Sequence, residues 1–215
     1  MDEEQRQGAV AVVSGGLDSV AALYLARERY SPLLVLTFDY GQPAAVREVE
    51  AAGFFARRLG LEHRVIPLRW LAGYLPAALD AGVSDDRAVW VPNRNGLFVN
   101  AAAAVAEAEG LGWVLAGFNR DEAAAFPDNS AAFVDAATGA LRYSTAGRVA
   151  LASPTVGMGK VELARYLRDE GAETARLWSC YGAGPGHCGC CPSCRRLFAA
   201  LEAAGVERSR WPPRS

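Results

Sequence analysis

The segment Ala9-Val10-Ala11-Val12-Val13-Ser14-Gly15-Gly16-Leu17-Asp18-Ser19-Val20 decides how this chain folds. It begins inside an apolar, partly β-branched run over residues 8–13, which predicts a buried strand. A Ser-Gly-Gly turn ends that run, and apolar residues then recur at helical spacing over residues 18–29. A strand, a tight glycine turn and a helix in direct succession predict the first unit of an α/β fold.

The same alternation continues along the chain. Further strands are predicted over residues 33–38, 62–66 and 113–116, and further helices over residues 46–59, 95–109, 159–170 and 192–204. Residues 67–93 are expected to form an insertion around the site, whereas residues 117–130 and 178–194 are expected to be irregular. The pattern predicts an α/β protein in which residues 1–172 form a parallel, Rossmann-like sheet with helices on both faces. Residues 173–215 are expected to form a small C-terminal module packed on it.

Composition and charge limit the classes of partner. The chain has 215 residues, of which 51% are hydrophobic and 21% charged, as is typical of a globular protein. Its formal net charge of 22 − 24 = −2 argues against binding nucleic acid mainly through phosphates. No run approaches the ~18 apolar residues that a membrane span needs, and the acidic start Met-Asp-Glu-Glu is unlike a secretory signal. We therefore expect a cytoplasmic protein with no nucleic-acid or membrane partner, and a homodimer is one oligomeric state left open.

The turn at residues 14–19 has the chemistry of an anion site. Its two glycines allow several backbone N–H groups to converge, and the positive end of the following helix dipole adds to them. Ser14 and Ser19 can donate through their hydroxyls, and a carboxylate at Asp18 beside a phosphate predicts Mg²⁺ as its counter-ion. The turn has neither the lysine of a P-loop nor the third glycine of a dinucleotide fingerprint. The alternative is a plain glycine-rich connection between a strand and a helix.

Four cysteines follow the spacing Cys180-x7-Cys188-x2-Cys191-x2-Cys194. Two-residue gaps let successive thiolates surround one ion, and four thiolates favour Zn²⁺, with an iron–sulfur cluster as the competitor. Disulfides are disfavoured in a reducing compartment and by the odd number of cysteines. A closed site with four protein ligands predicts one structural zinc per chain. His187 could replace one cysteine, and Cys190 is the expected non-ligand.

Beyond these two motifs, the chain resembles the 7-cyano-7-deazaguanine synthase family over residues 14–196. The Ser-Gly-Gly-x-Asp-Ser turn is similar to the loop with which ATP pyrophosphatases cleave ATP between its α and β phosphates. Further matches are Phe38-Asp39-Tyr40-Gly41-Gln42, Val91-Pro92-Asn93-Arg94-Asn95 with Phe98, Phe126-Pro127-Asp128, Ser153-Pro154 with Lys160, and Trp178-Ser179-Cys180-Tyr181. Each piece is short, but their order and combination are specific to the family.

The resemblance implies the fold of the adenine-nucleotide α-hydrolases and an ATP-dependent carbon–nitrogen ligase of queuosine biosynthesis. Such an enzyme uses Mg²⁺ and ATP to convert 7-carboxy-7-deazaguanine and ammonia into the 7-cyano base through an adenylated carboxylate and an amide. The nucleotide is expected to contact Val13, Ser14, Gly15, Gly16, Leu17, Asp18, Ser19, Val20, Phe38, Tyr40 and Gln42. The substrate is expected to contact Arg94, Asn95, Asp121, Phe126 and Asp128. The catalytic residues are expected to be Asp18, Ser19 and Lys160.

Several of these residues have a second interpretation. Asn95 could simply cap a helix, and Asp121, Glu122 and Asp128 could belong to a solvated acidic loop. A position past the carboxyl end of a strand instead favours ligand binding for at least one of them. Lys160 near a helix start is unusual for the dipole and could offset phosphate charge. The arginines near the end of the sequence, Arg196 among them, are expected to be solvated.

The sequence departs from the family at two places. Pro43-Ala44-Ala45 follows Gln42 where many members carry basic residues and a histidine, and Asn129-Ser130 stands where many carry Cys-Arg. Arg94 or Arg120 could replace the missing cation, and we expect Arg94 to pair with the substrate carboxylate. Three other functions are considered: amidation of a different carboxylate, tRNA thiolation, and zinc-dependent regulation by DNA binding.

Overall fold

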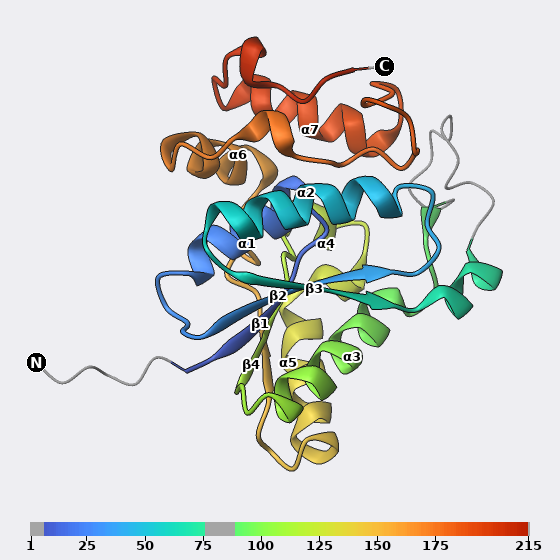
Figure 1. Ribbon diagram of the computed structural model, residues 1–215, viewed down its shortest axis with the longest axis vertical. Helices are drawn as coiled ribbons and strands as arrows, with labels where there is room; N and C mark the ends of the chain where they lie inside the picture. The colour runs from blue at the N-terminus through green and yellow to red at the C-terminus, as the bar shows by residue number, and fades with distance from the viewer. Residues whose placement is uncertain (1–6, 76–88, 215) are drawn as a thin grey trace, which may run out of the picture.

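The computed structural model describes residues 7–75 and 89–214 and has a five-stranded sheet at its centre (Figure 1). The strands are β1 (Ala9–Val12), β2 (Leu33–Asp39), β3 (Glu62–Pro67), β4 (Trp113–Leu115) and β5 (Ala150–Ala152). Their order is β3-β2-β1-β4-β5, and every neighbouring pair is parallel. The expected Rossmann-like sheet is therefore confirmed.

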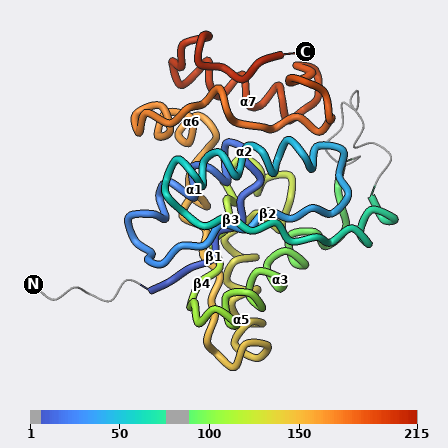
Figure 2. Tube along the Cα trace, in the orientation of Figure 1, coloured from blue at the N-terminus to red at the C-terminus, as the bar shows by residue number. Residues whose placement is uncertain are grey.

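Helices cover both faces of the sheet, as expected. On one face lie α1 (Leu17–Ala26) and α2 (Ala45–Arg58), with α6 (Lys160–Asp169) against α1 and α7 (Pro192–Ala203) on α6 (Figure 2). The other face is covered by α3 (Arg94–Ala108) and α5 (Ala131–Ser144). Side chains of β2 alternate between two apolar cores, with Leu34 and Leu36 towards α3 and Val35 towards α1 and α2. None of the helices in the described ranges is long and apolar enough to span a membrane.

Short helical segments occupy several connections. They are α4 (Arg120–Ala123) and the 3-10 turns η1 (Arg69–Tyr74), η4 (Pro127–Asn129), η5 (Thr174–Arg176) and η6 (Arg208–Arg210). The prediction that residues 117–130 are irregular was wrong for α4, because the Asn119 side chain accepts from the Glu122 N–H at 3.0 Å and starts a helical turn. Residues 76–88 of the expected insertion lie outside the described residues, as do residues 1–6 with their acidic start.

The sequence pattern predicts neither α5 nor β5. Leu141 is the only buried residue of α5, a fully described helix, so its apolar periodicity is weak. β5 has three residues, too few for a periodic signal. Tertiary contacts hold the two elements together, since Thr138 Oγ1 donates to the Leu151 carbonyl and accepts from its N–H, both at 3.1 Å.

The strand order determines where a ligand can bind. The chain leaves β1 towards α1 on one face of the sheet, whereas it leaves β4 towards α5 on the other. In parallel sheets, ligands bind in the crevice that such a divergence opens at the carboxyl ends of the strands. The segments that follow β1, β2 and β4 all reach this edge, and the predicted site residues lie on them.

Candidate active site

The loop between β1 and α1 is built to hold an anion. Gly15 has a φ of +79°, and a Cβ there would lie 2.9 Å from the backbone nitrogen of Ala52, so glycine is required. Ser19 Oγ closes the turn by accepting from the Ser14 N–H at 3.2 Å and donating to the Gly16 carbonyl at 3.1 Å. The first N–H groups of α1 lie next to this turn, where the helix dipole favours negative charge.

A lysine and two carboxylates lie beside the loop. Lys160 Nζ, on a side chain only 11% exposed, is 2.6 Å from Asp18 Oδ2 and 2.8 Å from Glu122 Oε1. Burial alone would lower the pKa of Lys160, but the charges of Asp18 and Glu122 outweigh it and raise that pKa. Burial raises the pKa of Asp18 to about 6, and its Oδ1 is buried without a hydrogen bond to any described residue. This oxygen remains available to a cation that arrives with a ligand.

The end of β2 forms an aromatic and polar wall. Phe38 stacks on Phe98 of α3, with ring centroids 4.4 Å apart. Gln42 is 5% exposed, and its Oε1 accepts from the Tyr40 N–H at 2.9 Å. Its Nε2 donates to the Phe38 carbonyl at 3.2 Å and to Glu48 Oε2 at 2.8 Å. Glu48 of α2 thus belongs to this wall, and burial raises the pKa of its carboxyl.

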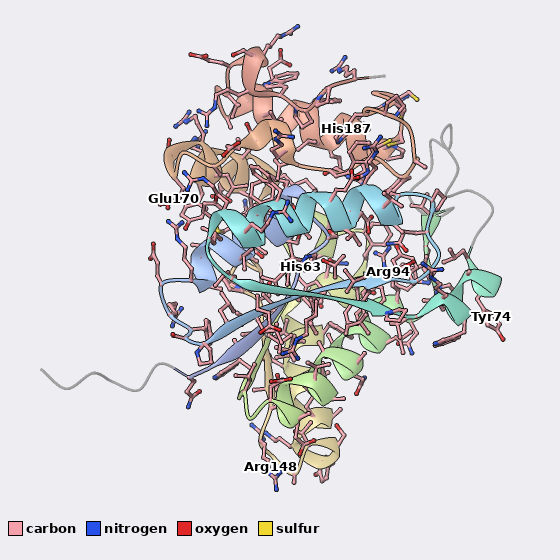
Figure 3. All side chains as sticks on the ribbon, viewed as in Figure 1. His63, Tyr74, Arg94, Arg148, Glu170 and His187 are labelled. Carbon is pink, nitrogen blue, oxygen red and sulfur yellow. The ribbon has the colours of Figure 1, made fainter. Side chains whose placement is uncertain are left out.

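A second wall, in contact with the first, comes from α3 and from the segment after β4. Asn93, with a φ of 54°, is the residue that precedes α3, so Arg94 begins the helix. Arg94 Nη1 donates to the Tyr40 hydroxyl at 3.3 Å (Arg94 is labelled in Figure 3). The interpretation of Asn95 as a cap was wrong, because its Nδ2 donates instead to the Asp128 carbonyl at 3.3 Å. Burial also raises the pKa of the Asp128 carboxyl.

These two walls and the loop enclose a cavity of about 270 Å³ at the carboxyl edge of the sheet. Of the sequence-predicted residues, those that line it are Val13, Ser14, Gly16, Asp18, Ser19, Phe38, Tyr40, Gln42, Arg94, Asn95, Phe126 and Asp128. Gly15 shapes the turn, and Leu17 and Val20 are buried in the core. Lys160 contacts the cavity residues Asp18 and Glu122. The structure thus brings the predicted nucleotide loop (residues 14–19) and most of the substrate candidates to one place.

Asp121, Arg120 and Ser130, which the sequence also brings into consideration, lie outside the cavity lining as well. Asp121 Oδ2 accepts from the N–H of Lys160 at 2.8 Å, at the start of α6. Arg120, considered as a replacement cation, is 60% exposed and forms an ion pair on the surface. Ser130 Oγ caps α5. Of the other departures from the family pattern, Pro43, Ala44 and Asn129 line the cavity, whereas Ala45 does not.

The cavity also contains residues that the sequence does not single out. Trp90 stacks on Phe126, with ring centroids 5.8 Å and planes 13° apart. The prediction that Arg196 is solvated was wrong: it lines the cavity, and its Nη2 donates to the Tyr181 hydroxyl at 3.4 Å. Its position two residues after Cys194 is the available signal, because a predicted metal ligand at the start of α7 would also fix the place of this side chain. Glu48 has no such signal, since an acid on an amphipathic helix usually faces solvent.

Four cysteine sulfurs meet in the C-terminal segment. The Sγ atoms of Cys180, Cys188, Cys191 and Cys194 all lie within 4.8 Å of one another, with Cys188 and Cys194 3.9 Å apart. A tetrahedron of Zn–S bonds of ~2.3 Å has sulfur–sulfur edges of about 3.8 Å, so these separations suit a single ion. A four-iron cluster binds each thiolate at a different iron and holds the sulfurs farther apart. The backbone N–H groups of Cys191 and Cys194 donate to the sulfurs of Cys188 and Cys191, both at 3.4 Å, which favours thiolates.

His187 and Cys190 lie outside this group. The His187 ring is buried beside the sulfur atoms (Figure 3), and its Nε2 accepts from the Ser179 N–H at 3.1 Å. Burial lowers the pKa of His187 to about 4, so the ring is neutral at pH 7. The suggestion that His187 replaces a cysteine was wrong, because the ligand group among the described residues consists of the four cysteines. Cys190 is exposed and outside the group, as expected.

The cysteine group and the nucleotide loop are joined through the backbone. The Trp178 N–H donates to the Gly15 carbonyl at 2.9 Å. Trp178 and Ser179 then line the cavity immediately before Cys180. Leu197 and Leu201 of α7 share an apolar core with α1 and α2. The C-terminal segment therefore supplies part of the cavity wall.

A family model described as queuosine biosynthesis protein QueC matches residues 8–205. The chain belongs to the QueC family. A relative from Pelotomaculum thermopropionicum, named 7-cyano-7-deazaguanine synthase, is 43% identical over 216 residues, which cover 92% of this chain and 98% of the relative. A relative of the same name from Desulforudis audaxviator is 41% identical, and the alignment covers 93% of this chain and 98% of the relative. The resemblance seen in the sequence is confirmed, and the chain is an enzyme of the QueC family.

The QueC fold extends to more distant proteins. The U34-tRNA thiolase NcsA from Methanococcus maripaludis, solved with its [4Fe-4S] cluster, has a TM-score of 0.58 and 16% identity. The alignment covers 95% of this chain and 66% of that one. At this identity the likeness concerns the fold alone, and it agrees with the α/β class expected from the sequence.

Proposed function

We propose that this chain is an ATP-dependent synthase that converts 7-carboxy-7-deazaguanine and ammonia into 7-cyano-7-deazaguanine. The observation that carries the proposal is the shared cavity, which is lined by a glycine-rich loop, an arginine and aromatic rings. A triphosphate suits the loop, and a planar aromatic acid suits the arginine and the rings. The QueC family and the names of the relatives support the same reaction.

The nucleotide is bound by the loop and its neighbours. The α1 N–H groups and the hydroxyls of Ser14 and Ser19 hold the phosphates. Lys160, a charged side chain next to Asp18, offsets part of their negative charge. Mg²⁺ fits at Asp18, because Oδ1 of that carboxylate is buried and accepts no hydrogen bond from a described residue. When bound, the ion supplies positive charge that stabilises the departing pyrophosphate.

The chemistry follows from the poor reactivity of a carboxylate towards ammonia. A carboxylate oxygen first attacks the α-phosphorus of ATP, and the bond to the β-phosphate oxygen breaks with release of pyrophosphate. Ammonia then displaces AMP and loses a proton, which gives the amide. A second ATP activates the amide oxygen in the same way. AMP leaves as the nitrogen loses its remaining protons, and the nitrile forms.

Arg94 is the residue we assign to the substrate carboxylate. Its guanidinium lines the cavity beside the Tyr40 hydroxyl, and a charge-assisted pair with a carboxylate contributes about 1.5–3 kcal/mol. Asn95, Asp128 and Phe126 lie on the same wall and are assigned to the base. The four cysteines are assigned to one structural Zn²⁺, which holds the wall formed by the C-terminal segment.

Product analysis tests the proposal. The purified protein is incubated with ATP, isotopically labelled ammonium and 7-carboxy-7-deazaguanine, and the products are identified by mass spectrometry. We expect the 7-cyano base carrying the labelled nitrogen, together with AMP and pyrophosphate. Formation of ADP and phosphate without AMP would contradict the assignment of the loop. Conversion of other carboxylates only, with amides as final products, would instead show an amidating enzyme.

A further inference from the structure

Glu48 is a partly buried acidic residue of the cavity that the reaction above does not use. Its Oε2 accepts from Gln42 Nε2 at 2.8 Å. Gln42 is itself fixed by two backbone groups, the Tyr40 N–H at 2.9 Å and the Phe38 carbonyl at 3.2 Å. The Glu48 carboxylate is therefore held in a defined orientation in the cavity wall, as a recognition group must be.

The surroundings of Glu48 suit a flat aromatic ligand. Phe38 and Phe98 stack with planes 20° apart, and Tyr40 packs on Phe98 with centroids 5.3 Å apart. Tyr40 connects the two charged groups of this region. Its backbone N–H donates to Gln42, which in turn donates to Glu48, and its hydroxyl accepts from Arg94. A carboxylate and a guanidinium thus line the same cavity, which suits a ligand that carries both N–H donors and an acid.

The hydrogen-bonding pattern of Glu48 limits the kind of ring that can bind. Because Gln42 donates to Oε2, the carboxylate presents acceptors to the cavity. Two adjacent N–H donors match two carboxylate oxygens, as a 2-amino-6-oxo ring offers at N1 and the 2-amino group. The adenine edge instead offers one donor and one acceptor. Glu48 therefore fits the deazaguanine ring better than the adenine of ATP.

We propose that Glu48 is a specificity-determining residue that accepts hydrogen bonds from the N1–H and 2-amino group of the base, while Arg94 takes its carboxylate. Gln42 positions Glu48 for this contact. The inference rests on the proposed function and deepens it by naming the residue that recognises the ring.

The test compares two bases in three proteins. Wild type, Glu48→Gln and Glu50→Gln are assayed with 7-carboxy-7-deazaguanine and with its analogue that lacks the 2-amino group. Glu50 is the matched control, because it lies on the same helix with 59% of its side chain exposed and pairs with Arg47. Wild type and Glu50→Gln should prefer the amino compound in kcat/KM by roughly 10- to 150-fold, as hydrogen bonds to a charged group provide. Glu48→Gln should retain only a few-fold preference, with an unchanged KM for ATP.

The inference would be overturned by a Glu48→Gln protein that keeps the wild-type preference, or by one in which the KM for ATP rises instead. Calorimetric binding of each base provides the same comparison without turnover. Wild-type protein that binds the amino compound selectively but does not convert it would refute the proposed function alone. Wild-type protein that binds neither base would refute the inference. If Glu48→Gln does not fold, Glu48→Asp shortens the side chain at constant charge and should also lose the preference.

Discussion

Replacing Gly117 by alanine would displace the nucleotide loop without removing any group that touches the nucleotide. A Cβ on Gly117 would lie 2.7 Å from the carbonyl carbon of Asp18, and 2.7 Å from both N and Cα of Ser19. Ordinary van der Waals contact begins near 3.4 Å, so the two segments would have to separate by about 3.4 − 2.7 = 0.7 Å. The neighbouring atoms are backbone and cannot rotate away as a flexible side chain could.

The expected effects follow from this displacement. Inserting a methyl group into a packed region costs about 1–3 kcal/mol, which corresponds to a melting temperature lower by about 2–12 °C for a chain of this size. Misplacing reacting groups by about 1 Å costs roughly 100-fold in rate. For a shift of about 0.7 Å, we therefore expect kcat/KM for ATP to fall by roughly 10- to 100-fold.

Gly112→Ala is the matched control, since the nearest atom to its added Cβ is the Arg148 carbonyl oxygen at 3.8 Å. Both variants are compared with wild type in thermal unfolding and in the rate of AMP release as a function of ATP concentration. Gly112→Ala should behave as wild type. The reasoning is refuted if Gly117→Ala matches this control in both measurements.

Three further predictions concern the metal, the buried cation and the C-terminal wall. Cys191→Ser should lose the metal and unfold at a lower temperature, because metal binding supplies folding free energy. Cys190→Ser should change neither the metal content nor the unfolding temperature. Elemental analysis that finds no zinc in wild-type protein would contradict the assignment. Lys160→Met leaves two neighbouring carboxylates without their cation. Urea denaturation at pH 7 should therefore show a free energy of unfolding lower by up to about 3 kcal/mol. An unchanged midpoint would count against the role of this ion pair. Arg196→Ala should raise the KM for ATP, because the charge of this guanidinium stabilises the ionised form of Asp18. Arg195→Ala should leave that KM unchanged. Equal KM values in the two variants would remove Arg196 from the site.

The parts of the molecule that depend on local chemistry could be predicted from the sequence. The turn at residues 14–19 needs its glycines and serines in a fixed order, so its position between a strand and a helix follows from the sequence alone. The spacing of the four cysteines likewise brings their sulfurs together in the structure. In both cases the residues that act together are close in the sequence or separated by a recognisable interval.

Residues that act together only through tertiary packing could not be predicted in this way. Asp121 and Asp128 follow the same strand and have the same charge, yet the first accepts from the start of α6 and the second lines the cavity. Their difference depends on where α6 packs, which no local pattern encodes. Glu48 enters the site because Gln42, held by the end of β2, donates to it. An i, i+6 spacing between a loop and a helix carries no general signal, so such a residue is found only once the fold is known.

The hydrogen bond between the Trp178 N–H and the Gly15 carbonyl has a consequence for the order in which the protein matures. During synthesis, β1 and its loop leave the ribosome early and can pair with β2 while the rest of the chain is still being made. The segment that covers the loop emerges much later, and under the proposed function its wall is complete only after the four cysteines have bound a metal ion. Supply of that ion would then control how quickly newly made chains acquire the proposed ATP site, even when the sheet is already complete.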